Sequence, residues 1–322
     1  MMQMGLLEAV DKPKPTTLET RTVDTEQIGG RHRMDKLYAN RKLAQGYPGL
    51  ERRAFEWYTN ALEELDKLRP GERSAYVDRL FTRLDRLVGL DRIKDVLVLG
   101  CGPRPLLAEA LIRKSYNVVG VEPVPSLARS AAKYLGSSDN ILQGSAEEIP
   151  LPSNSQDLVI SESVLEHVDS PIKSLNEIFR ALRPGGLTFI STTNRHRISL
   201  KGDNGEYNLK YFNWLPGIIK ESFVFHHLHY EPSLANYSLR PAVHWYSYAD
   251  LCKLGRQAGF HQFYSVLDVT EYDAPSIAKS RIRTLLLNKV KFNPWLRALA
   301  LTQIGGDGIF MLKRDDKAEI GT

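Results

Sequence analysis

The stretch V-L-V-L-G-C-G-P, from Val96 to Pro103, decides how the chain folds. Its four apolar residues predict a buried strand, and the chain then enters a turn that contains two glycines. Glycines let the backbone of such a turn approach a ligand closely, and the helix that follows can present free N–H groups to it. The stretch therefore predicts a strand, a turn and a helix, with a ligand site at the turn.

Short apolar runs alternate with helical stretches on the carboxyl side of this segment. The runs are N-V-V-G-V from residue 117, N-I-L-Q from 140, D-L-V-I from 157 and L-T-F-I from 187. Such strands favour a parallel sheet covered by helices on both faces, with ligands beyond the carboxyl ends of the strands. Further on, H-Q-F-Y-S-V-L-D-V from residue 261 and G-I-F-M-L-K-R from residue 308 are predicted as strands that could pair antiparallel.

An acidic residue stands at the end of the second predicted strand. Glu122 follows Gly102 by 20 residues, and at this spacing a carboxylate can accept hydrogen bonds from both hydroxyl groups of a ribose. The glycine turn and the carboxylate together indicate a nucleoside cofactor. A strand, a glycine pair and an exposed glutamate also arise together by chance, so these two features alone leave a purely structural role open.

Three further motifs follow in order, and with them the chain resembles the class I S-adenosylmethionine-dependent methyltransferases. The resemblance covers about residues 96–193 and is closest to the branch that includes the ubiquinone-pathway O-methyltransferases. G-S-A-E-E-I-P-L-P from residue 144 is similar to the adenine-binding turn. D-L-V-I-S-E-S-V-L-E-H-V from residue 157 looks like the strand and helix that form the floor of the active site, and L-R-P-G-G-L from residue 182 looks like the turn before strand five.

The resemblance implies S-adenosylmethionine as the cofactor and assigns roles to matching positions. The methionine end would face the glycine turn, Glu122 and Pro123 would lie at the ribose, two residues would flank the adenine, and one would close the floor. The residues of the glycine turn are Gly100, Cys101 and Gly102. Ser145 and Ala146 would flank the adenine, and Ser161 would close the floor.

Three positions depart from the family pattern. Val98 stands where the family commonly has an acidic residue, Arg104 where it has a third glycine, and Ser145 where it often has an aspartate that accepts from the adenine amino group. A serine hydroxyl accepts more weakly than a carboxylate. The Arg104 guanidinium could bind the methionine carboxylate by a charge-assisted hydrogen bond, or it could be a solvated residue at the start of the helix.

His167 is the candidate catalytic residue. It follows Glu166 just after the fourth predicted strand, and a neutral imidazole is suited to removing a proton from an acceptor during in-line methyl transfer. The alternative is that Glu166 and His167 only orient the floor of the site. Glu162 and Glu166 lie four residues apart and could share a helix face, but carboxylate pairs on helices are common, and no metal is expected.

Two segments lie outside the methyltransferase motifs. The first, about 195–245, is rich in aromatic residues and predicts an inserted cap over the substrate; it also contains His226, His227 and His229, which could bind zinc but are expected to pack in the cap. The second, 274–306, has six basic residues and no Asp or Glu. It could contact an anionic membrane or substrate, or it could be a helix with a solvated basic face.

Length and composition fit one folded domain with additions. The 322 residues carry a net charge of +5 and two cysteines, Cys101 and Cys252, which exclude a disulfide framework and favour a reducing, cytoplasmic setting. We expect a polar tail over 1–47, helices over 48–93 and the catalytic domain over 94–322. Apolar residues at helical spacing predict helices at about 52–68, 77–88 and 246–260. No leader or spanning segment is expected.

The sequence therefore predicts a Rossmann-like α/β fold with a seven-stranded, mostly parallel sheet and an antiparallel last strand. The predicted function is transfer of a methyl group from S-adenosylmethionine to a small-molecule or lipid-linked acceptor at a hydroxyl oxygen, with peripheral membrane contact through 274–306. A methyltransferase acting on RNA or protein is the first alternative, although nucleic acid is not expected as a partner. A nicotinamide-dependent oxidoreductase and a non-catalytic binding protein are the others.

Overall fold

The computed structural model describes residues 72–195, 211–212, 215–216, 219–220, 223–224, 242, 244–269, 289–290, 292–304 and 308–314. Several predictions fall outside these residues. They concern the polar tail, the helix over 52–68, most of the aromatic cap with His226, His227 and His229, and residues 274–288 of the basic segment 274–306.

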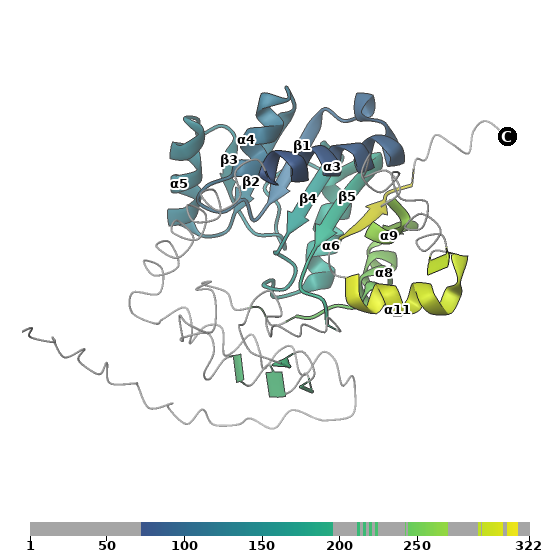
Figure 1. Ribbon diagram of the computed structural model, residues 1–322. Coiled ribbons are helices and arrows are strands. Elements are labelled where there is room, and N and C mark those ends of the chain that lie inside the picture. The colour runs from purple at the N-terminus through teal and green to yellow at the C-terminus, as the bar shows by residue number, and fades with distance from the viewer. Residues whose placement is uncertain are drawn as a thin grey trace, which may run out of the picture.

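A seven-stranded sheet forms the centre of the described structure (Figure 1). Its order across the sheet is β3-β2-β1-β4-β5-β7-β6. The strands are β1 (Asp95–Leu99), β2 (Asn117–Glu122), β3 (Ile141–Gln143), β4 (Gln156–Glu162), β5 (Leu182–Ser191), β6 (Gln262–Ser265) and β7 (Ile309–Leu312).

The direction of the strands confirms the predicted mostly parallel sheet. Strands β1 to β5 pair in parallel, whereas β7 is antiparallel to both β5 and β6. From β1 the chain first builds outward through β2 and β3, and then returns to the other side of β1 with β4. The carboxyl end of β1 is therefore the point where the strand order reverses, which is where ligands bind in open α/β sheets.

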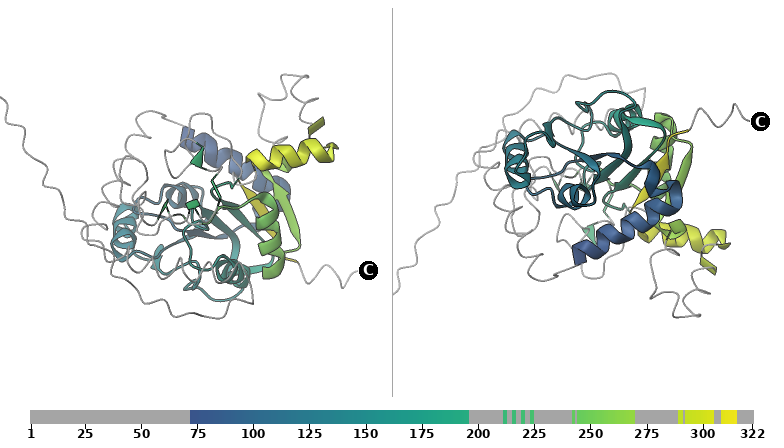
Figure 2. Two further views of the ribbon diagram at one scale, coloured as in Figure 1. Left: turned by 90° about the horizontal axis from the view of Figure 1, so that it is seen from below. Right: turned by 90° about the horizontal axis from the view of Figure 1, so that it is seen from above.

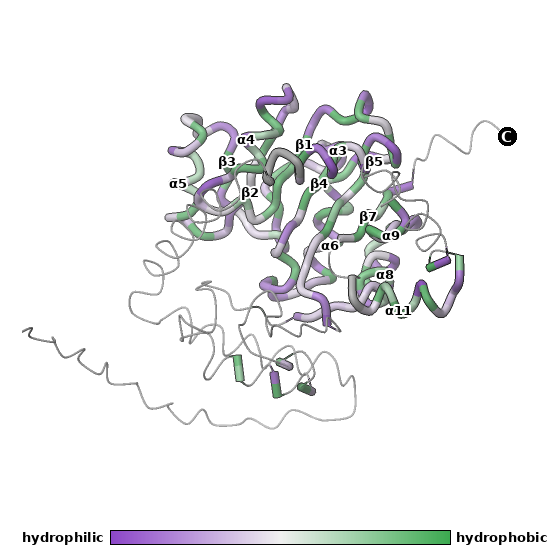
Figure 3. Tube along the Cα trace, viewed as in Figure 1, coloured by the Kyte–Doolittle hydropathy of each residue, from purple (hydrophilic) through white to green (hydrophobic). Residues whose placement is uncertain are grey.

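Helices cover both faces of the sheet, as Figures 1 and 2 show. On one face α3 (Glu72–Val88) and α4 (Leu106–Arg113) pack on β1, β4 and β5, and on the other α6 (Pro171–Ala181) and α8 (Tyr248–Ala258) do so. Helix α5 (Pro125–Leu135) lies along β2 and β3. The strands are largely hydrophobic along their length (Figure 3), as burial on both faces requires.

Two short elements differ from the prediction. The strand expected over residues 261–269 ends at Ser265, and α9 (Val266–Val269) follows as a helix. Asp268 of α9 accepts from the Ser265 backbone and hydroxyl and binds the Arg297 guanidinium of α11 (Pro294–Ile304). These side-chain contacts override the preference of V-L-D-V for a strand.

The second difference is the turn expected before strand five. L-R-P-G-G lies within β5, where the pairing with β4 shifts register between Gln156 and Leu158. Gly185 has φ +78°, and a Cβ on Gly186 would lie 2.8 Å from the Arg183 carbonyl oxygen. The two glycines therefore form an irregularity inside the strand.

Candidate functional site

The glycine loop after β1 has the conformation that its sequence requires. Gly100 and Gly102 have φ values of +62° and +67°, which side chains disfavour. The backbone N–H groups of Gly100 and Cys101 both donate to the Val121 carbonyl oxygen, at 2.8 and 3.3 Å. A Cβ on Gly102 would meet no atom within 4 Å, so the loop presents bare backbone to an open space.

Glu122, at the end of β2, faces this loop. One oxygen of its carboxylate accepts from the Gly102 backbone N–H at 3.0 Å, and the other accepts from the Val124 backbone N–H at 3.1 Å. The side chain is only 5% exposed. Each carboxylate oxygen can accept a second hydrogen bond, so Glu122 is held in place and can still bind hydroxyl groups of a ligand.

A pocket, here called the β2-side pocket, opens between the ends of β1, β2 and β4. Six of the predicted site residues are among those that line it: Gly100, Gly102, Glu122, Pro123, Ala146 and His167. Its other lining residues are Val121, Val124, Leu127, Gly144, Glu147, Ser163, Val164 and Val168. The mainly apolar wall and the carboxylate of Glu122 fit a flat, nucleoside-like ligand, and Glu147 is the other acidic residue of the lining.

Cys101, Ser145 and Ser161, which were also predicted for the site, are not among the lining residues of this pocket. The Cys101 thiol faces Gly120, and burial together with the charge of Glu122 raises its pKa to about 12. Ser161 is fully buried within β4, and Ser145 lies in the turn that pairs with Glu148. Cys101 is therefore a protonated thiol at the back of the loop.

Glu166 and His167, in the segment after β4, have different environments. Glu166 is buried and accepts hydrogen bonds from the Thr192 and Thr193 hydroxyls, at 2.7 and 3.2 Å. The His167 backbone N–H donates to the Val164 carbonyl oxygen, and its side chain lines the pocket. No regular helix is present over 163–169, so the expected helix face shared by Glu162 and Glu166 is wrong.

The end of the predicted cap is tied to this segment. The His244 ring lies 2.9 Å from the Val168 carbonyl oxygen, and the Tyr246 hydroxyl donates to the Leu165 carbonyl oxygen at 3.0 Å. Trp245 is buried and packs edge-on against Phe212, with the ring centroids 6.2 Å apart. His244 and Tyr246 thus tie the end of the predicted cap to the floor of the site.

A second hollow, here called the α3-side pocket, adjoins the first. Both pockets are lined by Gly100. The second is also lined by Tyr76 from α3, by Cys101 and Arg104 from the loop, and by Glu162 from β4. The Tyr76 hydroxyl donates to the Glu162 carboxyl, and the removal of that carboxyl from water raises its pKa to about 7.

Part of the lining of both pockets was not predicted from the sequence. The apolar walls at Val124, Leu127 and Val168 come from segments next to the recognised motifs, and their only signal was apolar character just after a strand end. Tyr76 lies 86 residues before Glu162, and no local pattern joins the two.

The described part of the chain contains no group of three or more His, Cys, Asp or Glu side chains that could hold a metal ion. It also contains no helix that is long and apolar enough to cross a membrane.

The fold and the pocket define a Rossmann-like domain with a nucleoside-type site, and comparisons with known proteins agree. Residues 97–190 match the methyltransferase domain family. A ubiquinone biosynthesis O-methyltransferase of Azorhizobium caulinodans is 34% identical over 126 residues, covering 38% of this chain and 48% of that protein. A protein of Mycolicibacterium smegmatis named as a probable S-adenosylmethionine-dependent methyltransferase is 35% identical over 103 residues, covering 32% of this chain and 39% of that protein.

The matched segment thus spans less than half of each of these relatives. Among solved structures, the plantazolicin methyltransferase BpumL, in complex with a desmethyl analogue and S-adenosylhomocysteine, has a TM-score of 0.49 and 14% identity, covering 88% of this chain and 99% of that one. Residues 97–190 of this chain therefore match the methyltransferase domain family, and the relatives that this part of the chain resembles are named as methyltransferases.

Proposed function

We propose that this chain transfers a methyl group from S-adenosylmethionine to a hydroxyl oxygen of a small-molecule or lipid-linked acceptor. The observation that carries the proposal is the Glu122 carboxylate, which two backbone N–H groups hold at the edge of the β2-side pocket beside bare glycine backbone. The carboxylate suits a ribose, and the apolar wall beside it suits an adenine.

The residues present fit this cofactor. Gly102 offers backbone where a side chain would fill the pocket, Glu122 would bind the ribose hydroxyls, and Ala146 would lie against the adenine. The bound cofactor supplies an electrophilic methyl group on a sulfonium. The protein then has to exclude water, align the acceptor oxygen for in-line attack, and remove its proton.

His167 is the proposed proton acceptor. Its side chain lines the β2-side pocket, while the neighbouring Glu166 is turned inward to the two threonines. A neutral imidazole in this place could take the hydroxyl proton as the oxygen–carbon bond forms. The alternative is that His167 only shapes the pocket, and a variant that keeps its hydrogen bonding but cannot act as a base separates the two.

The acceptor class rests on the relative and on the cap. The match to a ubiquinone biosynthesis O-methyltransferase favours oxygen and a lipid-linked substrate. The segment that contains the aromatic residues is tied to the floor through His244 and Tyr246, and such a cap could shelter an apolar acceptor. An RNA or protein acceptor has only the mild net charge of +5 in its favour.

Calorimetry tests the cofactor part of the proposal. The wild type should bind S-adenosylhomocysteine and not NADH. Gly102→Val, which fills the open space, and Glu122→Ala, which removes the ribose acceptor, should each weaken S-adenosylhomocysteine binding by about 10-fold to 100-fold. Glu148→Ala, an exposed glutamate in the neighbouring turn, is the matched control. Unchanged affinity in both pocket variants would reject the site, and preferential NADH binding would favour an oxidoreductase.

Release of S-adenosylhomocysteine tests the acceptor. Catechols and phenols with and without a prenyl chain should support turnover, and matched amines and carboxylic acids should not. Turnover with the amines alone would overturn the choice of oxygen. Turnover with RNA alone would favour the first alternative.

A further inference from the structure

The loop that carries His167, residues 163–169, is here called the floor loop. Two of its carbonyl groups accept hydrogen bonds from one distant residue, His244. The His244 backbone N–H donates to the Glu166 carbonyl oxygen at 3.3 Å, and the His244 ring nitrogen Nε2 lies 2.9 Å from the Val168 carbonyl oxygen. A carbonyl oxygen can only accept, so Nε2 carries a hydrogen and donates it. His244 therefore binds the carbonyl groups of the residues on either side of His167.

Tyr246 adds a third bond to the same loop. Its hydroxyl donates to the Leu165 carbonyl oxygen at 3.0 Å. His244 and Tyr246 are both buried, and the centroids of their rings lie 6.0 Å apart. Buried polar groups ordinarily find a hydrogen-bond partner somewhere in the fold, so the bonds alone would be unremarkable. What distinguishes these bonds is their common target, since all of them end on the floor loop.

The segment 244–246 is itself fixed to the sheet and to α8. The Tyr246 backbone N–H donates to the Thr193 carbonyl oxygen at 3.2 Å, just beyond β5, and the Arg195 backbone N–H donates to the Tyr246 carbonyl oxygen at 2.9 Å. The Arg195 guanidinium pairs with Asp250 of α8 at 3.3 Å. The segment therefore connects the rigid end of β5 to the floor loop.

The floor loop needs such support because it has no regular secondary structure. Its residues form turns and bends, and the His167 backbone N–H donates within the loop, to the Val164 carbonyl oxygen at 2.9 Å. In irregular backbone, small changes of the dihedral angles move a side chain far. The bonds from the segment 244–246 act at the positions next to His167, where such changes would matter most.

We propose that His244 and Tyr246 are positioning residues for methyl transfer, which fix the floor loop so that the His167 side chain lies at the β2-side pocket. This inference rests on the proposed function, in which His167 takes the proton of the acceptor. A general base must come within about 2.6 to 3.2 Å of the atom that carries the proton, and a displacement of about 1 Å can lower a rate about 100-fold. Loss of a bond to the floor loop should therefore lower kcat and leave the binding of the cofactor intact.

Turnover and cofactor binding of the full chain are the first readouts. His244→Phe removes the ring donor and keeps a ring, and Tyr246→Phe removes only the hydroxyl. Each should lower kcat about tenfold and leave S-adenosylhomocysteine affinity, measured by calorimetry, within about twofold of the wild type. His244→Gln keeps a side-chain N–H donor, so its kcat should recover to within about threefold of the wild type.

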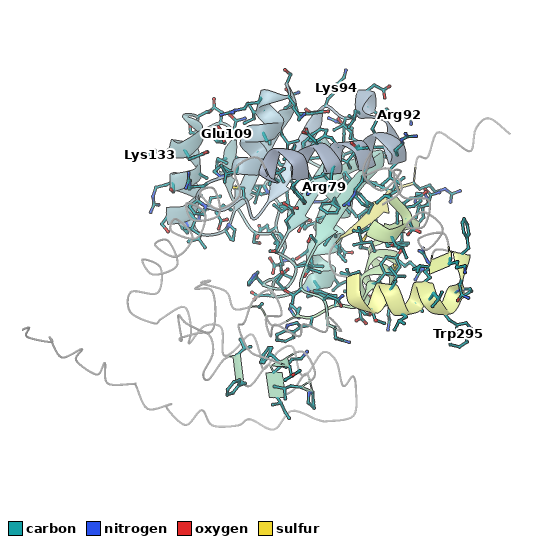
Figure 4. The ribbon with its side chains drawn as sticks, viewed as in Figure 1. Arg79, Arg92, Lys94, Glu109, Lys133 and Trp295 are labelled. Carbon is teal, nitrogen blue, oxygen red and sulfur yellow. The ribbon has the colours of Figure 1, made fainter. Side chains whose placement is uncertain are left out.

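Two variants control for effects that do not pass through the floor loop. Thr188→Val removes a buried hydroxyl that donates to the Val159 carbonyl oxygen at 3.0 Å, a bond like that of Tyr246 but between β5 and β4. Arg92→Gln changes an exposed side chain just before β1, at the end of the sheet opposite the pocket (Figure 4). Both variants should leave kcat nearly unchanged.

Nuclear magnetic resonance gives a readout that does not depend on catalysis. In the full chain labelled with ¹³C-histidine, the ring signal of His167 is identified by its loss in His167→Gln. This signal should move in His244→Phe and in Tyr246→Phe, because the ring changes its surroundings when the floor loop shifts. It should return toward its original position in His244→Gln and stay in place in the two controls.

The outcomes separate the inference from the proposed function. If the wild type releases no S-adenosylhomocysteine with any acceptor, or if His167→Gln retains normal turnover, the proposed function or its proton acceptor is wrong, and the inference fails with it. If His167→Gln is inactive but both phenylalanine variants keep normal kcat, or leave the His167 signal in place, only the inference is overturned.

A merely structural role would give a different pattern. If Thr188→Val lowers kcat as much as Tyr246→Phe does, or if kcat and S-adenosylhomocysteine affinity fall together in both phenylalanine variants, general loss of stability explains the result and the inference is overturned. Should His244→Phe fail to fold, Tyr246→Phe decides, because it keeps the buried ring. Lowered kcat with intact cofactor affinity, a shifted His167 signal and recovery in His244→Gln support the inference.

Discussion

Two glutamates near the end of β4, Glu166 and Glu162, have different environments on the two faces of the sheet. On the side of α6 and α8, Glu166 is buried and accepts from the hydroxyls of Thr192 and Thr193, at 2.7 and 3.2 Å. On the side of α3 and α4, Glu162 has the Tyr76 hydroxyl as its donor and lines a pocket. Burial raises the pKa of both carboxyls, and the hydrogen bonds from Thr192 and Thr193 oppose that rise at Glu166.

This difference distinguishes a carboxylate that the fold uses from one that a ligand can use. Ser163 separates the two with a φ of +52°, which turns the chain out of β4. Glu162 and Glu166 are four residues apart, a spacing that would place them on one face of a helix. Because the chain turns at Ser163, their carboxyls lie on different faces of the sheet. Sequence distance is therefore a poor guide to role where a strand ends.

The largest expected effect is at Glu166. Glu166→Ala removes the acceptor of two threonine hydroxyls and leaves a cavity, so the free energy of unfolding should fall by about 2 to 4 kcal/mol. Urea denaturation at pH 7 measures it. Glu166→Gln, which keeps one acceptor oxygen, should lose less, and exposed Glu148→Ala should lose almost nothing. A loss below about 1 kcal/mol in Glu166→Ala would mean that the two threonine hydrogen bonds do not stabilise the fold.

The next effect is at His167, which follows Glu166 but lines the β2-side pocket. His167→Gln keeps a hydrogen-bonding side chain that cannot act as a base, so turnover should fall about 100-fold while S-adenosylhomocysteine affinity stays within about twofold. The measurement is the rate of S-adenosylhomocysteine release with the best acceptor, together with calorimetry. Normal turnover in this variant would mean that His167 has only a structural role.

The pattern of strands was predictable because it depends on local sequence. Runs such as V-L-V-L predict strands whatever the rest of the chain does, and Glu122 follows from its 20-residue spacing to Gly102, since β1 and β2 are neighbours in the sheet. The hydrogen bond from Gly102 to Glu122 is the structural expression of that spacing.

The remaining features depend on contacts between distant segments. Nothing near Glu162 in the sequence indicates that Tyr76 donates to it, and nothing in V-L-D-V indicates that Arg297 will bind Asp268 and favour a helix. The Cys101 side chain likewise lies against Gly120 of the neighbouring strand β2, so its orientation depends on a segment that is distant in the sequence. Sequence motifs therefore predict which segments meet, whereas the roles of single side chains follow from packing.

The smallest expected effect is the change in the free energy of unfolding caused by Glu162→Gln. A carboxyl whose pKa is raised from 4.5 to about 7 on folding binds more protons in the folded state than in the unfolded state between these values, so the wild type loses stability as pH rises through that range. The shift corresponds to at most about 3 kcal/mol, and relaxation around the group reduces it to about 1 to 2 kcal/mol. Glutamine keeps an acceptor for Tyr76 and never ionises.

Glu162→Gln should therefore match the wild type in unfolding free energy near pH 4.5 and exceed it by about 1 to 2 kcal/mol at pH 8. Urea denaturation of both proteins across this range measures the difference, and the contribution of Glu166 cancels because both proteins retain it. A variant that gains stability at pH 8 while it loses affinity for S-adenosylhomocysteine would mean that the chain keeps an unfavourable carboxylate for its ligand. A variant less stable than the wild type at pH 8 would instead give Glu162 the structural role of Glu166, and the contrast between the two sides of β4 would disappear.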